Sequence, residues 1–276
     1  MTHMIYVVPS LKAKEKLQCE GKAWAESQGF AYVPRGKRTI QDLMDEYGED
    51  FLVYSSRGPQ IDRPEGSHFF SLNMAELRIQ NLRKGQRDHL LEALMGVKEY
   101  DLRPAAAQPP ISVLDCTCGF GADAAVASFG LPAGSRVDAL EVSPLLEAVT
   151  AWGFSHFVHK KDDVTAALRR ISLRCGDYRD YLLSDDGPVY DVLYFDPMFQ
   201  RPVEASCQFQ PVRAIMEHGG LTRDLIERAL QKARRRVVIK ERDFHQLCRD
   251  FPDVALYGGK YSRIGYAVLE CDSWKK

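Results

Sequence analysis

The sequence has little net charge for its size. Its 37 lysines and arginines nearly balance 38 aspartates and glutamates, which gives a formal net charge of −1 over 276 residues. General attraction to nucleic acid or to an anionic membrane is therefore excluded, and any such binding must come from local basic groups. With 45% hydrophobic residues the chain can bury a substantial core, so we expect a globular protein.

Long apolar runs and metal-binding cysteine patterns are also lacking. No run approaches the roughly 20 apolar residues that a membrane helix requires, and no basic-then-apolar signal opens the chain. The seven cysteines are an odd number, scattered along the chain, which does not indicate a disulfide framework. Cys116 and Cys118 lack the two-residue gap and the second ligand pair that are typical of zinc sites. We therefore expect a cytoplasmic protein with no metal, in which these two cysteines are small buried residues.

Short β-rich runs alternate with helical stretches in the first part of the chain. They predict strands at residues 5–9, 30–34 and 50–55, and helices at 11–28 and 39–47. A further helix would start at Asn73, which forms a capping-box pattern with Glu76, and continue to Leu94 with Gly85 as a candidate interruption. The pattern predicts a small N-terminal α/β lobe over residues 1–72 and a main domain over 73–276 that includes this leading helix.

Repeated strand–helix–strand units follow a connector rich in proline and alanine at residues 101–110. The predicted strands are "ISVLD", "RVDALE", "ISLRCGD", "YDVLYFD" and "RRVVIK", and the C-terminal "VALYGGKYSRIGYAVLE" predicts a hairpin. This order predicts an α/β fold with a Rossmann-like, doubly wound sheet that is mostly parallel and ends in an antiparallel C-terminal hairpin.

Acids end four successive strands of the predicted sheet. Ligands bind beyond the carboxyl ends of the strands in such folds, so these positions are the candidate site. Glycines in the first loop would let the backbone approach a ligand closely, and the acid after the second strand could accept both hydroxyl hydrogens of a ribose. An acid after the third strand could accept from an adenine amine. In chain order, the candidates are Asp115, Gly119, Gly121, Glu141, Gly176, Asp177 and Asp196.

Two cofactors fit the glycine loop. Residues 119–124, "GFGADA", match the G-x-G-x-x-G/A dinucleotide pattern, and Glu141 lies 20 residues after Gly121, as a nicotinamide enzyme would also show. However, Asp115 opens a D-x-x-x-G-x-G segment that would place an acid near the amino group of S-adenosyl-L-methionine. Asp115 and Asp123 would also repel a pyrophosphate. We therefore favour S-adenosyl-L-methionine and keep a nicotinamide-dependent oxidoreductase as the alternative.

The fourth predicted strand runs into Asp196-Pro197-Met198-Phe199. This tetrapeptide resembles the [D/N/S]-P-P-[Y/F] motif of amino-group methyltransferases. The Asp196 side chain and the Pro197 carbonyl could accept the two hydrogens of an exocyclic amine and favour a pyramidal nitrogen. Phe199 could provide a face on which the base stacks. Asp196, Pro197 and Phe199 are thus the candidate catalytic residues.

From about Met74 to the C-terminus, the chain resembles the RsmJ family of class I, S-adenosylmethionine-dependent methyltransferases, which modify guanine N2 in small-subunit ribosomal RNA. The resemblance lies in "LDCTCGFGADA", "ALEVSP", "YFDPMF" and "VVIKERDF", including the methionine at position 198. It departs at Cys116 and Cys118, where the family usually has alanine, and at Ala122, where it usually has arginine. The resemblance implies cofactor contacts at Asp123, Glu141, Val142, Gly176, Asp177 and Asp196, and a basic cluster at Arg83, Lys84 and Gly85.

The main hypothesis is methylation of an exocyclic amine, with guanine N2 in ribosomal RNA or in the small ribosomal subunit as the expected substrate. DNA adenine and a protein glutamine amide are alternative acceptors, and a non-catalytic RNA-binding protein is the alternative from another class. Basic groups could bind the phosphates of a nucleic acid. The candidates for this role are Arg83, Lys84, Arg87, Lys240, Lys260 and Arg263.

Overall fold

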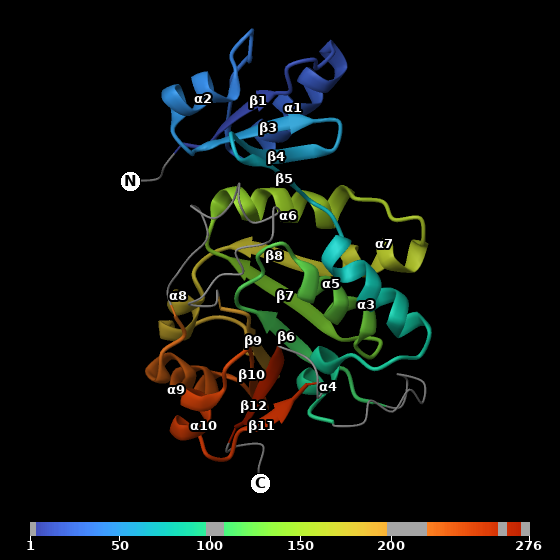
Figure 1. The fold of residues 1–276 in the computed structure, drawn as a ribbon, viewed down its shortest axis with the longest axis vertical. Coiled ribbons are helices and arrows are strands. Elements are labelled where there is room, and N and C mark those ends of the chain that lie inside the picture. The colour runs from blue at the N-terminus through green and yellow to red at the C-terminus, as the bar shows by residue number, and fades with distance from the viewer. Residues whose placement is uncertain (1–3, 98–107, 198–219, 259–263, 272–276) are drawn as a thin grey trace. The chain divides into compact units, whose positions relative to one another are not determined.

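The structure is a computed structural model that describes residues 4–97, 108–197, 220–258 and 264–271 (Figure 1). These residues form two compact units. The first comprises residues 4–71 and 143–157, and the second comprises 72–97, 108–142, 158–197, 220–258 and 264–271. The grouping of residues 143–157 with the N-terminal residues was not predicted. The domain division after residue 72 stays a prediction about independent folding.

The first unit contains a five-stranded sheet in the order β2-β1-β3-β4-β5. The strands β1, β2 and β3 are parallel, whereas β4 and β5 continue as antiparallel neighbours. The hairpin of β4 and β5 was not predicted, because its segment contains glycine, proline and charged residues and shows no clear alternation. The elements are β1 (Tyr6–Pro9), α1 (Glu15–Ser27), β2 (Ala31–Tyr32), α2 (Ile40–Tyr47), β3 (Phe51–Ser55), β4 (Gly58–Arg63), β5 (Gly66–Phe69) and α6 (Pro144–His156).

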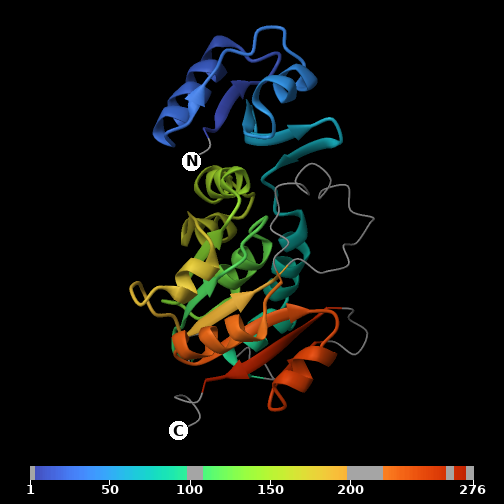
Figure 2. The same ribbon diagram turned by 90° about the vertical axis from the view of Figure 1, so that its left-hand side faces the viewer.

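Alternating side chains place α1 and α2 on opposite faces of this sheet (Figure 2). Val8 packs with Leu43 of α2, whereas the neighbouring Val7 packs with Ala25 of α1. This is the period-two pattern of a strand that is covered on both sides. The third helix of the unit, α6, contacts β4.

The second unit contains a seven-stranded sheet in the order β11-β12-β10-β9-β6-β7-β8. The neighbouring strands β10, β9, β6, β7 and β8, in this order across the sheet, are all parallel to one another. Strand β12 is antiparallel to both of its neighbours, β10 and β11. The predicted fold class is confirmed. The strands are β6 (Ser112–Asp115), β7 (Arg136–Glu141), β8 (Ile171–Cys175), β9 (Val192–Phe195), β10 (Arg236–Glu241), β11 (Ala255–Tyr257) and β12 (Gly265–Glu270).

Seven helices accompany this sheet among the residues that the structure describes. They are α3 (Asn73–Arg83), α4 (His89–Met95), α5 (Ala122–Gly130), α7 (Asp162–Arg169), α8 (Tyr178–Leu183), α9 (Arg223–Lys232) and α10 (His245–Asp250). The break expected at Gly85 is confirmed, since its φ of 76° lies in the left-handed region between α3 and α4. The expected capping box is wrong. Leu72 precedes α3 without a side-chain cap, and Glu76 instead accepts a hydrogen bond from Gln80 and pairs with His159.

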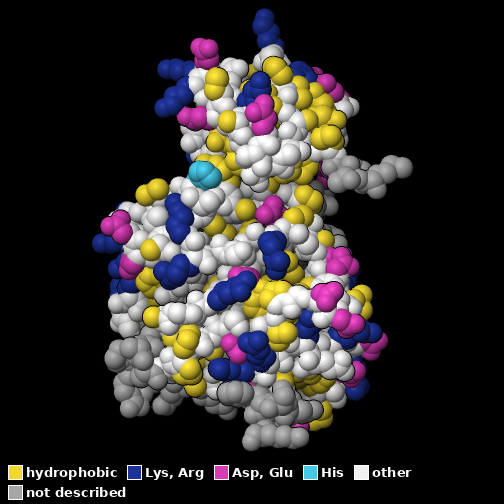
Figure 3. Space-filling view, turned by 180° about the vertical axis from the view of Figure 1, so that it is seen from behind, with side chains coloured by type: hydrophobic (Ala, Val, Ile, Leu, Met, Phe, Trp, Pro, Cys, Tyr) yellow, Lys and Arg dark blue, Asp and Glu magenta, His cyan; other side chains and the backbone are white. Residues whose placement is uncertain are grey.

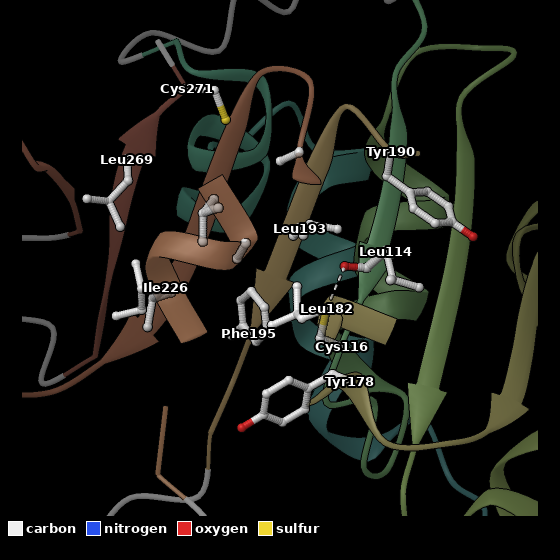
Figure 4. Close-up of a cluster of buried hydrophobic side chains, with 14 of the residues drawn as sticks. Leu114, Cys116, Tyr178, Leu182, Tyr190, Leu193, Phe195, Ile226, Leu269 and Cys271 are labelled. Atoms are coloured by element: carbon white, nitrogen blue, oxygen red, sulfur yellow. Dashed lines mark hydrogen bonds between the residues drawn. The ribbon is translucent and has the colours of Figure 1, made fainter. Parts of the chain in front are cut away.

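An apolar cluster of the second unit lies between the sheet and the helices α8 and α9 (Figure 4). Leu114, Leu193 and Phe195 point into it from β6 and β9. Cys116 also belongs to this cluster, and Cys118 is buried, which confirms the expectation that both are packed residues. Because strand side chains alternate, the residues between these core positions face the other side of the sheet, where Tyr194 bonds to a residue of α5.

No helix in the described parts of the chain combines the length and the apolar character that crossing a bilayer requires.

Candidate active site

The loop after β6 is shaped by two glycines. Gly119 has a φ of 53° and Gly121, which precedes α5, has a φ of 76°, both in the left-handed region that favours glycine. A Cβ at Gly119 would meet one neighbouring atom, the carbonyl oxygen of Thr117 at 3.9 Å. The backbone at this position is therefore open to the close approach of a ligand.

Hydrogen bonds join this loop to the ends of the neighbouring strands. The amide of Gly119 donates to Oε2 of Glu141 at 2.8 Å, and the amide of Cys118 donates to the carbonyl of Leu140 at 2.9 Å. On the other side, the amide of Asp196 donates to Oγ1 of Thr117 at 2.7 Å. The ends of β7, β6 and β9 thus lie side by side, as the sequence order of the acids predicted.

The end of β8 joins the same rim. The amide of Gly176 donates to the carbonyl of Glu141 at 2.9 Å. Asp177 precedes α8 and accepts a hydrogen bond from the amide of Arg179 at 2.8 Å, and its carboxylate also pairs with the Arg179 guanidinium. Burial acts to raise the pKa of Asp177, but the bonds from Arg179 outweigh this effect and hold it below its ordinary value. The pairing with Arg179 was not predicted.

Asp115 is buried at the end of β6, and its side chain accepts a hydrogen bond from the amide of Thr117 at 3.1 Å. Burial raises its pKa well above the ordinary value, and the charges of Asp123 and Asp196 act in the same direction. A cationic group beside it would lower this pKa again. Its position therefore suits the ammonium of an amino-acid moiety.

Asp196 follows β9 and is the more accessible acid of the rim, with 29% of its side chain exposed. Its Oδ2 accepts from Nζ of Lys240 at 2.7 Å. The pKa of Asp196 is raised to about 6. Burial is the largest cause, Lys240 acts to lower the pKa, and Asp123 acts to raise it. Pro197 is half-buried next to it, and the predicted residues Met198 and Phe199 lie outside the described part of the chain.

Asp123, a predicted cofactor contact, bonds to three groups of the chain. It is buried in the first turn of α5, where it bonds to Nζ of Lys240 at 2.8 Å, to the hydroxyl of Tyr194 at 2.7 Å and to the guanidinium of Arg78. Burial acts to raise the pKa of Asp123, but Lys240 and Arg78 outweigh it and lower the pKa well below its ordinary value. The carboxylate is therefore a permanent anion that holds together three donors of the chain.

Lys240, a predicted phosphate ligand, pairs with two acids of the site. Its side chain is 14% exposed, and its ammonium bonds to Asp123 and Asp196. Burial acts to lower the pKa of Lys240, but the two carboxylates outweigh this effect and raise it. A phosphate would have to displace two close anionic partners to reach this ammonium.

The other predicted basic residues are divided by the structure. Arg83, Lys84 and Arg87 are exposed around the turn between α3 and α4, and Arg83 pairs with Asp163, as Arg87 does with Glu92. Lys260 and Arg263 lie outside the described residues. On the face drawn in Figure 3, lysine and arginine side chains alternate with acidic and apolar ones, which agrees with the near-zero net charge.

Sequence reasoning missed three residues of this site: Arg78, Thr117 and Tyr194. Tyr194 had a usable signal, because it lies two positions before Asp196 on a strand and must therefore share its face. Arg78 lies in α3 and had no such signal. Its pairing with Asp88 and Asp123 joins segments that are distant in sequence, so no local pattern could indicate it.

These residues fit a particular kind of cofactor. Glu141 offers more acceptor positions than its bond to Gly119 uses and can receive ribose hydroxyls, whereas Asp115 can receive an ammonium. An acidic rim with an open glycine loop suits a cationic, ribose-bearing molecule better than a pyrophosphate. Fold and site together define an enzyme of the Rossmann-like class that holds a positively charged nucleoside cofactor.

A family model described as "Putative SAM-dependent methyltransferase" matches residues 76–264. The chain belongs to this family of S-adenosylmethionine-dependent methyltransferases, and S-adenosyl-L-methionine is its cofactor. This result confirms the cofactor that the sequence favoured over a nicotinamide.

Several relatives resemble the chain over much of its length. The protein YpiP of Bacillus subtilis is 28% identical over 236 residues, which cover 85% of this chain and 88% of the relative. The ribosomal RNA small subunit methyltransferase J of Dechloromonas aromatica is 27% identical over 72% of this chain and 76% of its own length. That of Saccharophagus degradans is 34% identical over 56% of this chain and 61% of its own length. The resemblance to the RsmJ family is thus confirmed.

A solved structure supports the fold. The crystal structure of a SAM-dependent methyltransferase from Neisseria gonorrhoeae has a TM-score of 0.62 to this chain, covers 97% of it and 96% of its own chain, and is 17% identical in sequence. The fold therefore also occurs in a solved structure of distant sequence.

Proposed function

We propose that this protein methylates an exocyclic amine of ribosomal RNA, with N2 of a guanine in the small subunit as the target. The proposal is supported by the relatives named as ribosomal RNA small subunit methyltransferase J. It is also supported by the Asp196-Pro197 pair at the end of β9, which is the observation on which it depends. A ribosomal substrate would place the protein in the cytoplasm, as the sequence analysis expects.

Asp196 is positioned to handle an amine. Its backbone is fixed by the bond to Thr117, its Oδ2 by the bond to Lys240, and 29% of its side chain remains exposed. A carboxylate has about four lone-pair positions, so it can accept a hydrogen of the amine in addition to these bonds. The carbonyl of Pro197 would accept the second hydrogen. Holding both hydrogens directs the nitrogen lone pair away from the ring of the base.

The bound cofactor supplies an electrophilic methyl group, and the remaining tasks fall to the chain. The amine must lose a proton as it is alkylated, and the carboxylate of Asp196, with a pKa of about 6, can take it. Orientation of this kind can contribute about 7–11 kcal/mol in well-aligned systems. A base in a helix would also be flipped out, at a cost of a few kcal/mol, which phosphate contacts of Arg83, Lys84 and Arg87 could offset.

Mass mapping of modified nucleotides tests the target. Ribosomal RNA from cells that lack the protein should lack one N2-methylguanine, and the wild-type gene should restore it. The Asp196→Ala gene should not restore it. Calorimetry on the Asp196→Ala protein should nevertheless show S-adenosylmethionine binding close to wild type and no binding of NAD. If the deletion strain kept all methyl marks of its ribosomal RNA and lost one from DNA adenine or a protein glutamine, the proposed substrate would be wrong and the molecule that lost the mark would be the substrate.

A further inference from the structure

An alternating row of charges crosses the second unit from the leading helix to the candidate catalytic acid. Asp88 pairs with Arg78 through two bonds, at 2.7 and 2.8 Å, and Arg78 pairs in turn with Asp123. Lys240 then bonds to Asp123 at 2.8 Å and to Asp196 at 2.7 Å. Each cation therefore lies between two carboxylates, and Asp196 ends the row. Of the two carboxylates that Lys240 contacts, that of Asp196 is the more exposed.

The sheet register explains why Lys240 reaches Asp196. Strands β9 and β10 are parallel neighbours, with Phe195 opposite Ile239 as the last pair of the ladder. Phe195 and Ile239 both point into the apolar cluster of Figure 4, so the next residues, Asp196 and Lys240, both point to the other face. The contact is thus built into the sheet and does not depend on a surface loop.

We propose that Lys240 is a positioning residue for methyl transfer, which fixes one oxygen of the Asp196 carboxylate and keeps this group an anion that only accepts hydrogen bonds. This inference rests on the proposed role of Asp196 as the acceptor for the target amine. A protonated carboxyl would present a hydroxyl donor to the amine hydrogens and would repel them. A carboxylate without an anchor could rotate away from the amine.

The surroundings of Asp196 show why a cation is needed there. Among the described residues, Asp123 and Glu241 also act on the pKa of Asp196 and both raise it, and the hydroxyl of Tyr194, which bonds to Asp123, adds no positive charge. In addition to Lys240, the titratable groups that face Asp196 are Asp115 on β6, Asp123 on α5, Tyr194 on β9 and Glu241 on β10. Burial also raises the pKa of Asp196, whereas Lys240 lowers it and so favours the carboxylate form.

The remaining charges hold Lys240 in place. Its second bond is to Asp123, which Arg78 and Tyr194 fix from other directions. Tyr266 on β12 lies opposite Lys240 in the antiparallel ladder and is itself buried. Lys240 therefore cannot turn toward solvent without abandoning a buried carboxylate, and its geometry is suited to orienting Asp196.

The pH dependence of kcat tests the inference, because a merely structural lysine would not move it. An opposite charge at this distance lowers a carboxyl pKa by about 1–3 units. Lys240→Met should therefore shift the acid limb of kcat upward by about 1–3 pH units. At pH 7, kcat should fall about 2- to 100-fold, and it should recover toward pH 9, while the Kd for S-adenosylmethionine stays within about threefold of wild type. Lys240→Arg keeps the charge and should keep the acid limb of kcat near its wild-type position. Lys160→Met, which removes an exposed lysine of the same unit, is the matched control.

A second measurement does not depend on activity. Selective carbon-13 labelling of aspartate carboxyls, with the Asp196 resonance assigned from Asp196→Asn, should show a higher titration midpoint in Lys240→Met than in wild type. If Lys240→Met does not fold, Lys240→Gln and Lys240→Arg provide the same comparison. Unchanged titration and an unchanged kcat profile in the neutral variant would overturn the role of Lys240. Full turnover in Asp196→Ala would instead overturn the proposed function, so the two failures are distinguishable.

Discussion

The carboxylate of Glu141 accepts a hydrogen bond from the backbone amide of Gly119 at 2.8 Å. This bond joins the end of β7 to the glycine loop after β6 and fixes the acid at the position where a ribose is expected. Glu141 therefore holds the loop, and we propose that it also receives the cofactor.

Substitution of Glu141 separates these tasks. Glu141→Gln keeps an oxygen that can accept from Gly119 but loses the charge, whereas Glu141→Ala loses both. We expect the Kd for S-adenosylmethionine to rise about 3- to 10-fold in the first variant and about 10- to 100-fold in the second, which corresponds to about 1–3 kcal/mol for bonds to a charged group. Calorimetry measures both values. Glu227→Ala removes an exposed acid that pairs with Arg223 and is the control, and a wild-type Kd in Glu141→Ala would contradict the assignment.

Asp115 predicts a specific pH dependence of stability. Its pKa is raised in the folded chain, so the folded state binds more protons than the unfolded state above the ordinary pKa of about 4. The free energy of unfolding should therefore decrease as the pH rises from about 4 toward the raised pKa. Asp115→Asn should remove this slope and raise the melting temperature of the cofactor-free protein at pH 7.

Thermal denaturation between pH 5 and 8 measures this effect, with Asp186→Asn as an exposed control. The same variant should bind S-adenosylmethionine more weakly, because the proposed partner of the ammonium loses its charge. A variant that is less stable than wild type at pH 7 would show that Asp115 is ionised in the folded chain.

Tyr194 and Tyr190 allow a matched test of the buried network. The hydroxyl of Tyr194 donates to Asp123 at 2.7 Å, and that of Tyr190 donates to Asp138 at 2.5 Å. Each phenylalanine variant loses one bond to a charged group, so each should lower the free energy of unfolding in urea by about 1.5–3 kcal/mol. Only Tyr194→Phe should also lower kcat, because Asp123 supports Lys240 and Asp138 does not. Equal kcat values in the two variants would separate Asp123 from the catalytic network.

The exposed basic residues of the turn between α3 and α4 predict a salt effect. Lys84→Ala combined with Arg87→Ala should weaken RNA binding at all sequences. It should also reduce the slope of log K against log salt concentration by about 0.7–0.9 for each phosphate contact that is lost. Filter binding at several salt concentrations measures this slope. Arg223→Ala, which removes an exposed charge on α9, should leave the slope unchanged, and an unchanged slope in the double variant would exclude this turn from the RNA-binding surface.

The local patterns of the sequence were sufficient for the main sheet and its acids. Alternating apolar runs that end in Asp115, Glu141, Asp177 and Asp196 predicted neighbouring strands with one shared rim, since the carboxyl ends of parallel strands meet at the same edge. The glycines at 119 and 121 were predicted from the same pattern, and both have the left-handed backbone that glycine adopts without strain.

By itself, the sequence thus determined the fold class and the acids at the strand ends and favoured the cofactor class, because each depends on residues that are close in the chain. Only the tertiary structure decided the ionic partners: it pairs Lys240, a candidate phosphate ligand, with Asp196, and it joins Asp123, a candidate cofactor contact, to Arg78 and Lys240. The physical reason is that Coulomb interactions depend on distance in space, and the register of β9 against β10 brings together charges that are 44 residues apart.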